Sequence, residues 1–304
     1  MKRDIWTIVH DDKYELWLLS KQIESYLIKE VPNRYNVIIN DPDNVCKKIR
    51  SKLQKFVSRL NKRHQKNIEV HIWFRSDFLN DNEVVKEHEH DMSGYINQQL
   101  LKLQVYKCSN YQDHVVLDAK NIFLTKDAAN QVTGYKGSSE HYGFAGCYNQ
   151  CCNRWFGGRF IKISHMANPF VFKRKVLKAL EKDFGSRAAY FKFLTQPFEL
   201  ENEKLYALAK EYNNREPKRH NGVLSEFVTY CVFQQYYNNL TDFKAPVQST
   251  KNRKNVFLLN RNEKPNYSRK VYNEHYFLSY HKTIIINHGG FKVAEREINK
   301  AMGI

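Results

Sequence analysis

The sequence predicts an α/β fold with a parallel sheet at its centre, and three observations support this expectation. Short apolar runs alternate with longer segments of helical periodicity, in the order strand, helix, strand, helix, strand. A fourth apolar strand follows after another helical segment. Hydrophobic residues make up 42% of the 304 residues, which is a globular composition. Strands separated by helices usually pair in parallel, because each helix carries the chain back across a face of the sheet.

The first five elements follow from the spacing of apolar residues. A β-type run at 4–10 precedes a segment at 13–27 whose leucines and isoleucine recur at helical spacing. A second strand is expected at 34–40, followed by the turn or helix-start signal Asp-Pro-Asp and a helix at 45–66. A third strand is expected at 67–74. The apolar stripe of the second helix consists of Ile49, Leu53, Phe56, Val57 and Leu60.

The rest of the chain is predicted from similar signals. A polar loop at 76–94 leads to a helix at 95–107 and a strand at 114–118, and loops with short strands are expected at 127–165. The segment from Pro169 to Gly185 predicts a helix, because proline favours a helix start and glycine a helix end. Further helices are expected at 201–213, 224–239 and 291–302, and strands at 255–260 and 283–287.

Composition narrows the class of protein. No apolar run approaches the roughly 20 residues that a membrane-spanning helix needs. The first residues do not have the pattern of a signal peptide, and the six cysteines lack the spacing of secreted disulfide frameworks. We therefore expect reduced thiols and a cytoplasmic location. The formal net charge of +17 favours a polyanionic partner, and nucleic acid over a membrane surface.

The end of the fourth strand is the first candidate site. The strand HVVLD ends on Asp118, Ala119, Lys120 and Asn121. A strand that ends in a polar turn is common, but open α/β sheets also bind ligands at the carboxyl ends of their strands.

Here the sequence resembles a family of glycosyltransferases with the GT-A fold. The segments SGYINQQLLKL and HVVLDAKNIFL resemble the family's helix and strand around its D-x-D position. Further similar segments are TIVHDDKYELWLLSKQIESYL, NPFVFKRKVLKALE, HNGVLSEFVTYCVF and FLSYHK. The resemblance covers about residues 4–282. It implies a single GT-A-like domain over residues 1–304, with a nucleotide-sugar-binding Rossmann-type half at 1–125 and a helical, acceptor-binding half at 126–304.

The sequence departs from the family's D-x-D motif, whose acids hold a divalent metal on the donor diphosphate. Lys120 occupies the position of the second acid, and a cation cannot be a metal ligand. Two interpretations follow. Either Asp118 binds Mn²⁺ or Mg²⁺ with help from water and phosphate, or Lys120 and other cations neutralise the diphosphate. We favour the metal, because Asp118 alone would repel phosphate.

The resemblance implies roles for residues elsewhere in the chain. Glu226 is the expected catalytic base for the acceptor hydroxyl, with Tyr230 one helical turn along. The predicted donor-binding residues, for a UDP-sugar, are Asp11, Asp12, Asp118, Lys120, Asn121, His281 and Lys282. Ordinary structural roles are the alternatives. Glu226 lies after the plausible N-cap Ser225, and the Asp pair suits a helix start. The run EHEHD at 87–91 is interpreted as a solvated loop, and a zinc site at the clustered cysteines is not favoured.

Two one-sign basic segments predict a nucleic-acid surface. Residues 44–66 contain no acid, although helix surfaces normally mix charges. Lysines and arginines that contact the backbone supply most of the sequence-independent affinity for DNA. The candidate DNA-binding residues are Lys47, Lys48, Arg50, Lys52, Lys55, Arg59, Lys62, Arg63, Lys251, Arg253, Lys254 and Arg261.

Together these signals predict a transferase that moves a sugar from a UDP-sugar to 5-hydroxymethylcytosine in duplex DNA. Some tailed phages carry such enzymes, which protect the genome from host nucleases, and the host cytoplasm would then be the location. Arabinose, glucose and galactose all remain open. Two alternatives stand beside this hypothesis. One is a glycosyltransferase acting on lipopolysaccharide, capsule or another glycan, and the other is a non-catalytic DNA-binding protein on the same fold.

Overall fold

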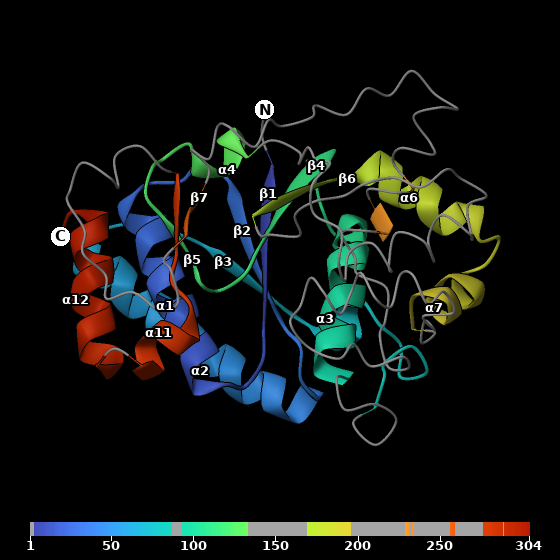
Figure 1. The fold of residues 1–304 in the computed structure, drawn as a ribbon, viewed down its shortest axis with the longest axis horizontal. Coiled ribbons are helices and arrows are strands. Elements are labelled where there is room, and N and C mark those ends of the chain that lie inside the picture. The colour runs from blue at the N-terminus through green and yellow to red at the C-terminus, as the bar shows by residue number, and fades with distance from the viewer. Residues whose placement is uncertain are drawn as a thin grey trace, which may run out of the picture.

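A five-stranded sheet forms the centre of the molecule (Figure 1), with the strand order β3-β2-β1-β4-β6. The computed structural model describes residues 3–86, 93–132, 169–195, 229–230, 233, 256–258, 276–287 and 289–304. The parallel strands are β1 (Asp4–Val9), β2 (Arg34–Ile39), β3 (Val70–Phe74) and β4 (Asp113–Leu117). The edge strand β6 (Phe170–Lys173) runs antiparallel to β4.

Helices cover both faces of this sheet. The helices α1 (Lys13–Ile28) and α2 (Asp43–His64) pack on one face, where Ile5, Val9 and Val37 belong to the core. Trp6 and Ile8 point to the opposite face, because neighbouring residues of a strand alternate in direction. That second face is covered by α3 (Ser93–Gln104), α6 (Arg174–Asp183) and α7 (Arg187–Thr195).

A smaller sheet continues from the end of β4. It has the order β5-β8-β7 and consists of β5 (Asn121–Phe123), β8 (Phe277–Ser279) and β7 (Val256–Leu258). After β8 come the helices α11 (Lys282–Asn287) and α12 (Gly290–Met302). Phe291 of α12 packs against Tyr14 and Trp17 of α1, with ring centroids 5.3 and 5.1 Å apart. The remaining short elements are η1 (Arg75–Asp77), η2 (Val105–Lys107) and α4 (Ala128–Gln131).

The predicted α/β fold is confirmed, including the alternation of strands and helices and the fourth parallel strand. The predicted stripe of α2 is also confirmed, since Ile49, Leu53, Val57 and Leu60 are buried. The final helix, α12, lies where the sequence predicts it. No described helix combines the length and apolar composition needed to cross a bilayer.

Two predicted elements are wrong. The segment from Pro169 does not start as a helix, because Phe170–Lys173 form strand β6, with alternate side chains buried on both faces of the sheet. The run 283–287 is helical in α11, where Ile284 and Ile285 are buried and Ile286 is exposed. Short apolar runs do not distinguish a strand from a buried helix.

The sequence analysis did not predict α7, and parts of the remaining expectations lie outside the described residues. Within the predicted helix at 224–239, Thr229, Tyr230 and Phe233 are described and are helical. The described C-terminal half contains the strands β6, β7 and β8 beside its helices. Strand β7 lies within the strand predicted at 255–260, whereas β6 and β8 were not predicted. The expected helix at 201–213 and most of the expected loops at 127–165 lie outside the described residues.

Candidate functional site

The candidate site lies at the carboxyl edge of the central sheet, where the strand order reverses. The chain runs outward from β1 to β2 and β3, and then returns through α3 to β4 on the other side of β1. Helix α1, which leaves β1, and helix α3, which leads into β4, therefore pack on opposite faces of the sheet, and the strand order reverses between β1 and β4. In open α/β sheets this is the position where ligands bind. Asp118 directly follows β4 at this edge.

The turn after β4, residues Asp118–Asn121, is fixed by its own hydrogen bonds. We refer to it as the β4 turn. The Asn121 N–H donates to the Asp118 carbonyl at 2.9 Å, and the Asp118 N–H donates to the side-chain Oδ1 of Asn121 at 2.9 Å. The Tyr280 N–H donates to the Lys120 carbonyl at 2.9 Å. Asn121 is fully buried. Its side chain thus stabilises the turn from inside, and the donor-binding role expected for it stays a prediction.

Gln22 of α1 also stabilises this turn through buried hydrogen bonds. Its Nε2 donates to the carbonyls of Asp118, at 2.9 Å, and Asn121, at 2.7 Å. Its Oε1 accepts hydrogen bonds from Thr7 Oγ1 at 2.9 Å and from the Tyr35 hydroxyl. Burial holds the pKa of Tyr35 above its usual range, so this hydroxyl stays a neutral donor. The sequence analysis missed Gln22, whose only signal is a polar residue on an apolar helix face.

The carboxylate of Asp118 lies against two lysines. Lys120 Nζ is 2.7 Å from Asp118 Oδ2, and Lys102 Nζ is 3.8 Å from Asp118 Oδ1. The side chains differ in exposure: 28% for Lys120, 23% for Asp118 and only 5% for Lys102. Two cations and one carboxylate give this cluster a formal charge of +1 (+2 − 1). We call these three residues the lysine-aspartate cluster.

Lys102 reaches the cluster from α3, and the sequence analysis missed it. Gln98 lies one helical turn earlier, and its Nε2 donates to the Ile8 carbonyl at 3.4 Å, so this side of α3 faces the sheet. The available signal was a lysine placed between Leu101 and Leu103, both of which are buried. A lysine at such a position needs a partner, because burying an unpaired charge is costly.

The ligand atoms that the described residues offer at this turn do not suit a divalent metal. A metal would need oxygen ligands from several side chains, and Asn121 directs its Oδ1 to the backbone. Among the described residues, no group of three or more His, Cys, Asp and Glu side chains is placed to hold a metal ion. Asp118 also has an ammonium group near each of its oxygens, and ammonium groups repel a divalent cation. The same ammonium groups suit phosphate oxygens.

The predicted residues His281 and Lys282 lie next to this turn, although they are far from it in the sequence. Strand β8 pairs antiparallel with β5, which places Ser279 opposite Asn121. Tyr280 then bonds to the Lys120 carbonyl, and the following residue, His281, is half-buried. Lys282 opens α11 and is exposed. The structure thus brings the two predicted segments together.

Asp11 and Asp12 follow β1 at the same edge, with different surroundings. Asp12 is the N-cap of α1, and its Oδ1 accepts from the N–H groups of Tyr14 and Glu15 at 2.9 Å each. This is the helix-start role that the sequence left open. Asp11 is exposed, and its N–H donates to Asp41 Oδ2 at 2.8 Å. Burial raises the pKa of Asp41.

The start of α3 closes over the ends of β1 and β2. Asn40 Nδ2 donates to the Gly94 carbonyl at 3.0 Å and lies 3.3 Å from His10 Nε2. A Cβ atom at Gly94 would lie 3.3 Å from His10 Cε1, so the helix approaches the strand end closely. His10 and Asn40 were not predicted as site residues. Their signal is their position directly after apolar strands.

Several predicted residues lie outside the described part of the chain. Tyr230 is described, and it lies in the core: its hydroxyl accepts from the Lys173 N–H at 3.0 Å, and its ring is 4.9 Å from that of Phe172. The residues outside the described ranges are the expected base Glu226, the basic residues Lys251, Arg253, Lys254 and Arg261, the run 87–91 and the cysteines at 147, 151 and 152.

The solvent side of α2 carries the other predicted cations. All eight are exposed: Lys47, Lys48, Arg50, Lys52, Lys55, Arg59, Lys62 and Arg63. We call these residues the basic face of α2. Arg63 lies 3.6 Å from Glu24, and Arg50 lies over the ring of Phe74. For the other six, no ion pair with an acidic side chain occurs within the described ranges.

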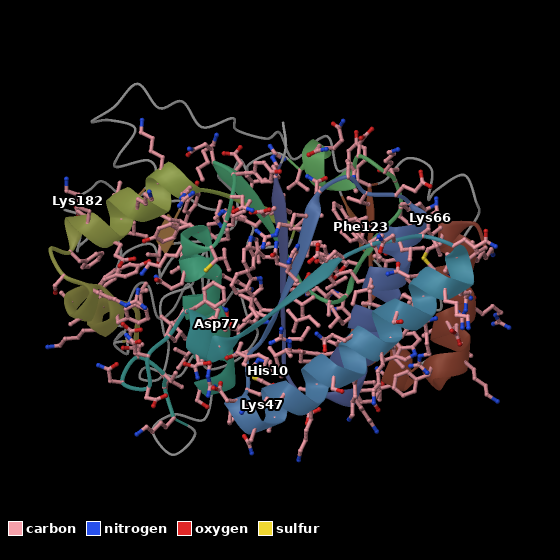
Figure 2. The ribbon with its side chains drawn as sticks, turned by 180° about the vertical axis from the view of Figure 1, so that it is seen from behind. His10, Lys47, Lys66, Asp77, Phe123 and Lys182 are labelled. Atoms are coloured by element: carbon pink, nitrogen blue, oxygen red, sulfur yellow. The ribbon has the colours of Figure 1, made fainter. Side chains whose placement is uncertain are left out.

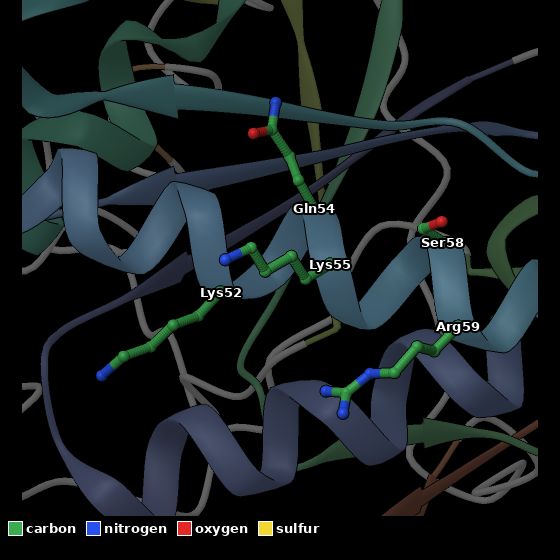
Figure 3. Close-up of a pocket in the computed structure, with 5 residues that line it drawn as sticks. All are labelled: Lys52, Gln54, Lys55, Ser58 and Arg59. Atoms are coloured by element: carbon green, nitrogen blue, oxygen red, sulfur yellow. The ribbon is translucent and has the colours of Figure 1, made fainter.

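An open hollow of about 670 Å³ lies on this face (Figure 3) and is lined by Lys52, Gln54, Lys55, Ser58 and Arg59. All five side chains come from one helix, so the hollow is part of an exposed surface rather than an enclosed site for a small molecule.

The basic face starts at the carboxyl edge of the sheet and runs away from it. Helix α2 leaves the carboxyl end of β2 and returns the chain to the start of β3, so it spans the sheet from edge to edge. Figure 2 shows Lys47 at the end of α2 near His10, and Lys66 at the far end. Only the first turns of α2 therefore border the carboxyl edge.

Comparison with known proteins gives distant structural matches. No protein-family profile and no curated protein matches this sequence. A solved structure of the galactosyltransferase LgtC with donor and acceptor sugar analogues is 12% identical, with a TM-score of 0.41, and the match covers 99% of this chain and 95% of that chain. Mouse xyloside xylosyltransferase 1 is 10% identical, with a TM-score of 0.39 and coverages of 79% and 84%. At these TM-scores the matches do not establish an activity for this chain.

Proposed function

We propose that this chain is a nucleotide-sugar-dependent glycosyltransferase whose donor diphosphate binds at the β4 turn. The observation that carries the proposal is the lysine-aspartate cluster at the carboxyl edge, beside the reversal of strand order. Sugar transfer releases a nucleoside diphosphate, and positive charge fixed where the leaving group develops its negative charge lowers the barrier. The support for this activity is the site and the sequence resemblance, not the distant structural matches.

The remaining roles in this proposal follow from the sequence resemblance. Residues 1–125 would supply most of the UDP-sugar site, and residues 126–304 would supply the base and part of the acceptor site. His281 and Lys282 follow the strand that pairs with β5, and in this proposal they would add hydrogen bonds or charge to the diphosphate. Glu226 is the proposed base, which would accept the proton of the acceptor hydroxyl as that oxygen attacks C1 of the sugar. Asp11 is the exposed member of its pair and the better candidate for a contact with the nucleoside.

We further propose 5-hydroxymethylcytosine in duplex DNA as the acceptor. The basic face of α2 supports this step, because a 22-residue helix is about 33 Å long and presents cations along much of that length. Such a row suits the repeated charges of a DNA backbone. Its first turns lie at the carboxyl edge, so a duplex on this face could present one nucleotide to the site. The hydroxymethyl group would be reached in the major groove or after base flipping.

The test is transfer of label from a panel of UDP-sugars to matched duplexes that contain either cytosine or 5-hydroxymethylcytosine. Each reaction is run with Mn²⁺ and with EDTA. We expect label only on the hydroxymethylated duplex. Hydrolysis of UDP-sugar without labelled DNA would exclude the DNA acceptor and favour a glycan. Salt-dependent duplex binding with neither transfer nor hydrolysis would favour a non-catalytic DNA-binding protein.

A further inference from the structure

We infer that the site neutralises the donor diphosphate with the ammonium groups of Lys102 and Lys120 and needs no divalent metal. This inference rests on the proposed function and goes beyond it, since it assigns the cation that the leaving group meets. The sequence analysis favoured a metal on Asp118. The geometry of the lysine-aspartate cluster points to the other interpretation, and it adds Lys102, which the sequence analysis did not consider.

The first argument is the position of the Lys120 ammonium group. It lies 2.7 Å from Asp118 Oδ2, in hydrogen-bond contact with one of the two oxygens that this carboxylate could offer a metal. Because Lys120 also occupies the sequence position of the second acid in D-x-D, one substitution both removes a metal ligand and introduces a cation. The turn thus offers an ammonium group at the position where the resemblance would require a second carboxylate.

The second argument is the charge of the cluster. A metal site of the D-x-D type combines two carboxylates with one divalent ion, which gives a formal charge of zero (−2 + 2). The lysine-aspartate cluster has a formal charge of +1 without any ion. Its two ammonium groups therefore favour an anionic diphosphate, and repulsion from them would oppose a divalent cation placed beside them.

The two ammonium groups are held in position before a diphosphate binds. The turn that carries Asp118 and Lys120 is fixed by Gln22 and by the Tyr280 N–H, so its geometry is set before any ligand arrives. Asp118 orients both ammonium groups, which makes it a positioning residue for phosphate rather than a ligand for it. Lys102 comes from the helix that covers the opposite face of the sheet, so the two cations approach from different elements. Cations fixed in this way cost little reorganisation on binding.

The test measures binding of nucleoside diphosphates to the full chain by calorimetry, in EDTA and in Mn²⁺, with UDP first and then GDP, CDP and ADP. For wild type we expect dissociation constants that agree within about twofold between the two conditions. Lys102→Met and Lys120→Met should each weaken binding by about tenfold or more in both conditions, since each removes a charged hydrogen-bond donor. The control matched to Lys120 is Lys107→Met, whose lysine side chain is 33% exposed, against 28% for Lys120, and is ion-paired to Glu181 at 3.2 Å; it should bind like wild type.

A further variant tests the inference in the opposite direction, by introducing a possible metal site. Lys120→Asp restores the D-x-D pattern and should lose binding in EDTA but recover at least tenfold of it in Mn²⁺, because two carboxylates now share the turn. Circular dichroism and thermal unfolding confirm that each variant is folded. Wild-type binding that requires Mn²⁺ would overturn the inference and leave the proposed function intact. If none of the nucleoside diphosphates binds in either condition, the proposed function itself fails.

Discussion

Positive charge gathers in two regions of this molecule, and their surroundings differ. In the lysine-aspartate cluster, both lysines lie near a carboxylate, one is almost fully buried, and the supporting turn is fixed by hydrogen bonds. On the basic face of α2, eight cations extend into solvent from a single helix. The first arrangement suits one small anion in one orientation. The second suits a polyanion, whose many weak contacts do not require fixed side chains. The predictions below separate the two regions experimentally.

The largest effect is expected for Gln22, which stabilises the β4 turn of the lysine-aspartate cluster. Gln22→Leu removes the buried donor that the carbonyls of Asp118 and Asn121 share. It also removes the acceptor that the hydroxyls of Thr7 and Tyr35 share. Because each unsatisfied buried group costs about 1–3 kcal/mol, we expect the free energy of unfolding to fall by about 3 kcal/mol. Urea denaturation measures this change.

The control is Gln54→Leu on the exposed side of α2, which should change the free energy of unfolding by less than about 0.5 kcal/mol. Equal effects of the two substitutions would show that Gln22 does not support the β4 turn as described.

Lowering the pH should reduce the free energy of unfolding through a buried histidine of the central sheet. His114 of β4 is fully buried, and burial, with a smaller effect of the Arg174 charge, lowers its pKa from 6.5 to about 3. The unfolded chain therefore binds the extra proton between these pH values, and stability falls as the pH drops below 6.5. This one group should cost about 2 kcal/mol between pH 7 and pH 5.

The measurement is the difference between wild type and His114→Leu in urea denaturation at pH 7, 6 and 5. The substitution should remove about 2 kcal/mol of the loss that wild type shows over this range. Parallel pH profiles for the two proteins would contradict the assignment to His114.

Charge reversal on the basic face of α2 should weaken the binding of a polyanion and leave the binding of UDP unchanged. The triple variant Lys52→Glu, Lys55→Glu and Arg59→Glu changes exposed side chains, so we expect little loss of stability. Duplex DNA binding should weaken by about tenfold or more, with a shallower dependence on salt, while UDP binding stays unchanged. Fluorescence anisotropy at several salt concentrations measures both quantities. An unaltered salt slope would show that DNA does not bind this face.

The smallest effect is expected at Asp12, which caps α1. Asp12→Ala should lower the free energy of unfolding by about 1 kcal/mol, because two N–H groups lose their acceptor. Asp12→Asn keeps an acceptor and should leave both stability and UDP binding nearly unchanged. If Asp12→Asn clearly weakened UDP binding while stability stayed unchanged, the Asp12 carboxylate would instead contact the donor nucleotide.

The sequence was informative where a structural pattern is local. The strands β1, β2 and β4 are short apolar runs with buried residues on both faces, and α2 has a clear apolar stripe, so all four were predicted. The positions of Asp118 and Lys120 at a strand end were also predicted. Their partners were not, because Gln22 and Lys102 lie 96 and 16 residues away from Asp118 in sequence and meet it only after the sheet has formed.

The errors have a similar origin. The segment at 170–173 is a strand because β4 offers it an edge to pair with, and this edge is invisible in the local sequence. The isoleucines of α11 have strand propensity, but they lie in a helix that buries only two of them. Tertiary packing decides between alternatives that a short apolar run leaves open.

The pairing of β5 with β8 has a consequence for the order in which a ribosome delivers this chain. The β4 turn is complete once residue 121 has been made, but the N–H that holds the Lys120 carbonyl belongs to Tyr280, more than 150 residues later. Phe291, which packs against α1, and the Met302 carbonyl, which accepts from Lys29 at the end of α1, are made later still. A nascent chain that ends before β8 therefore carries both lysines and the aspartate without the strand that fixes their turn. Such long-range closure also favours slow folding.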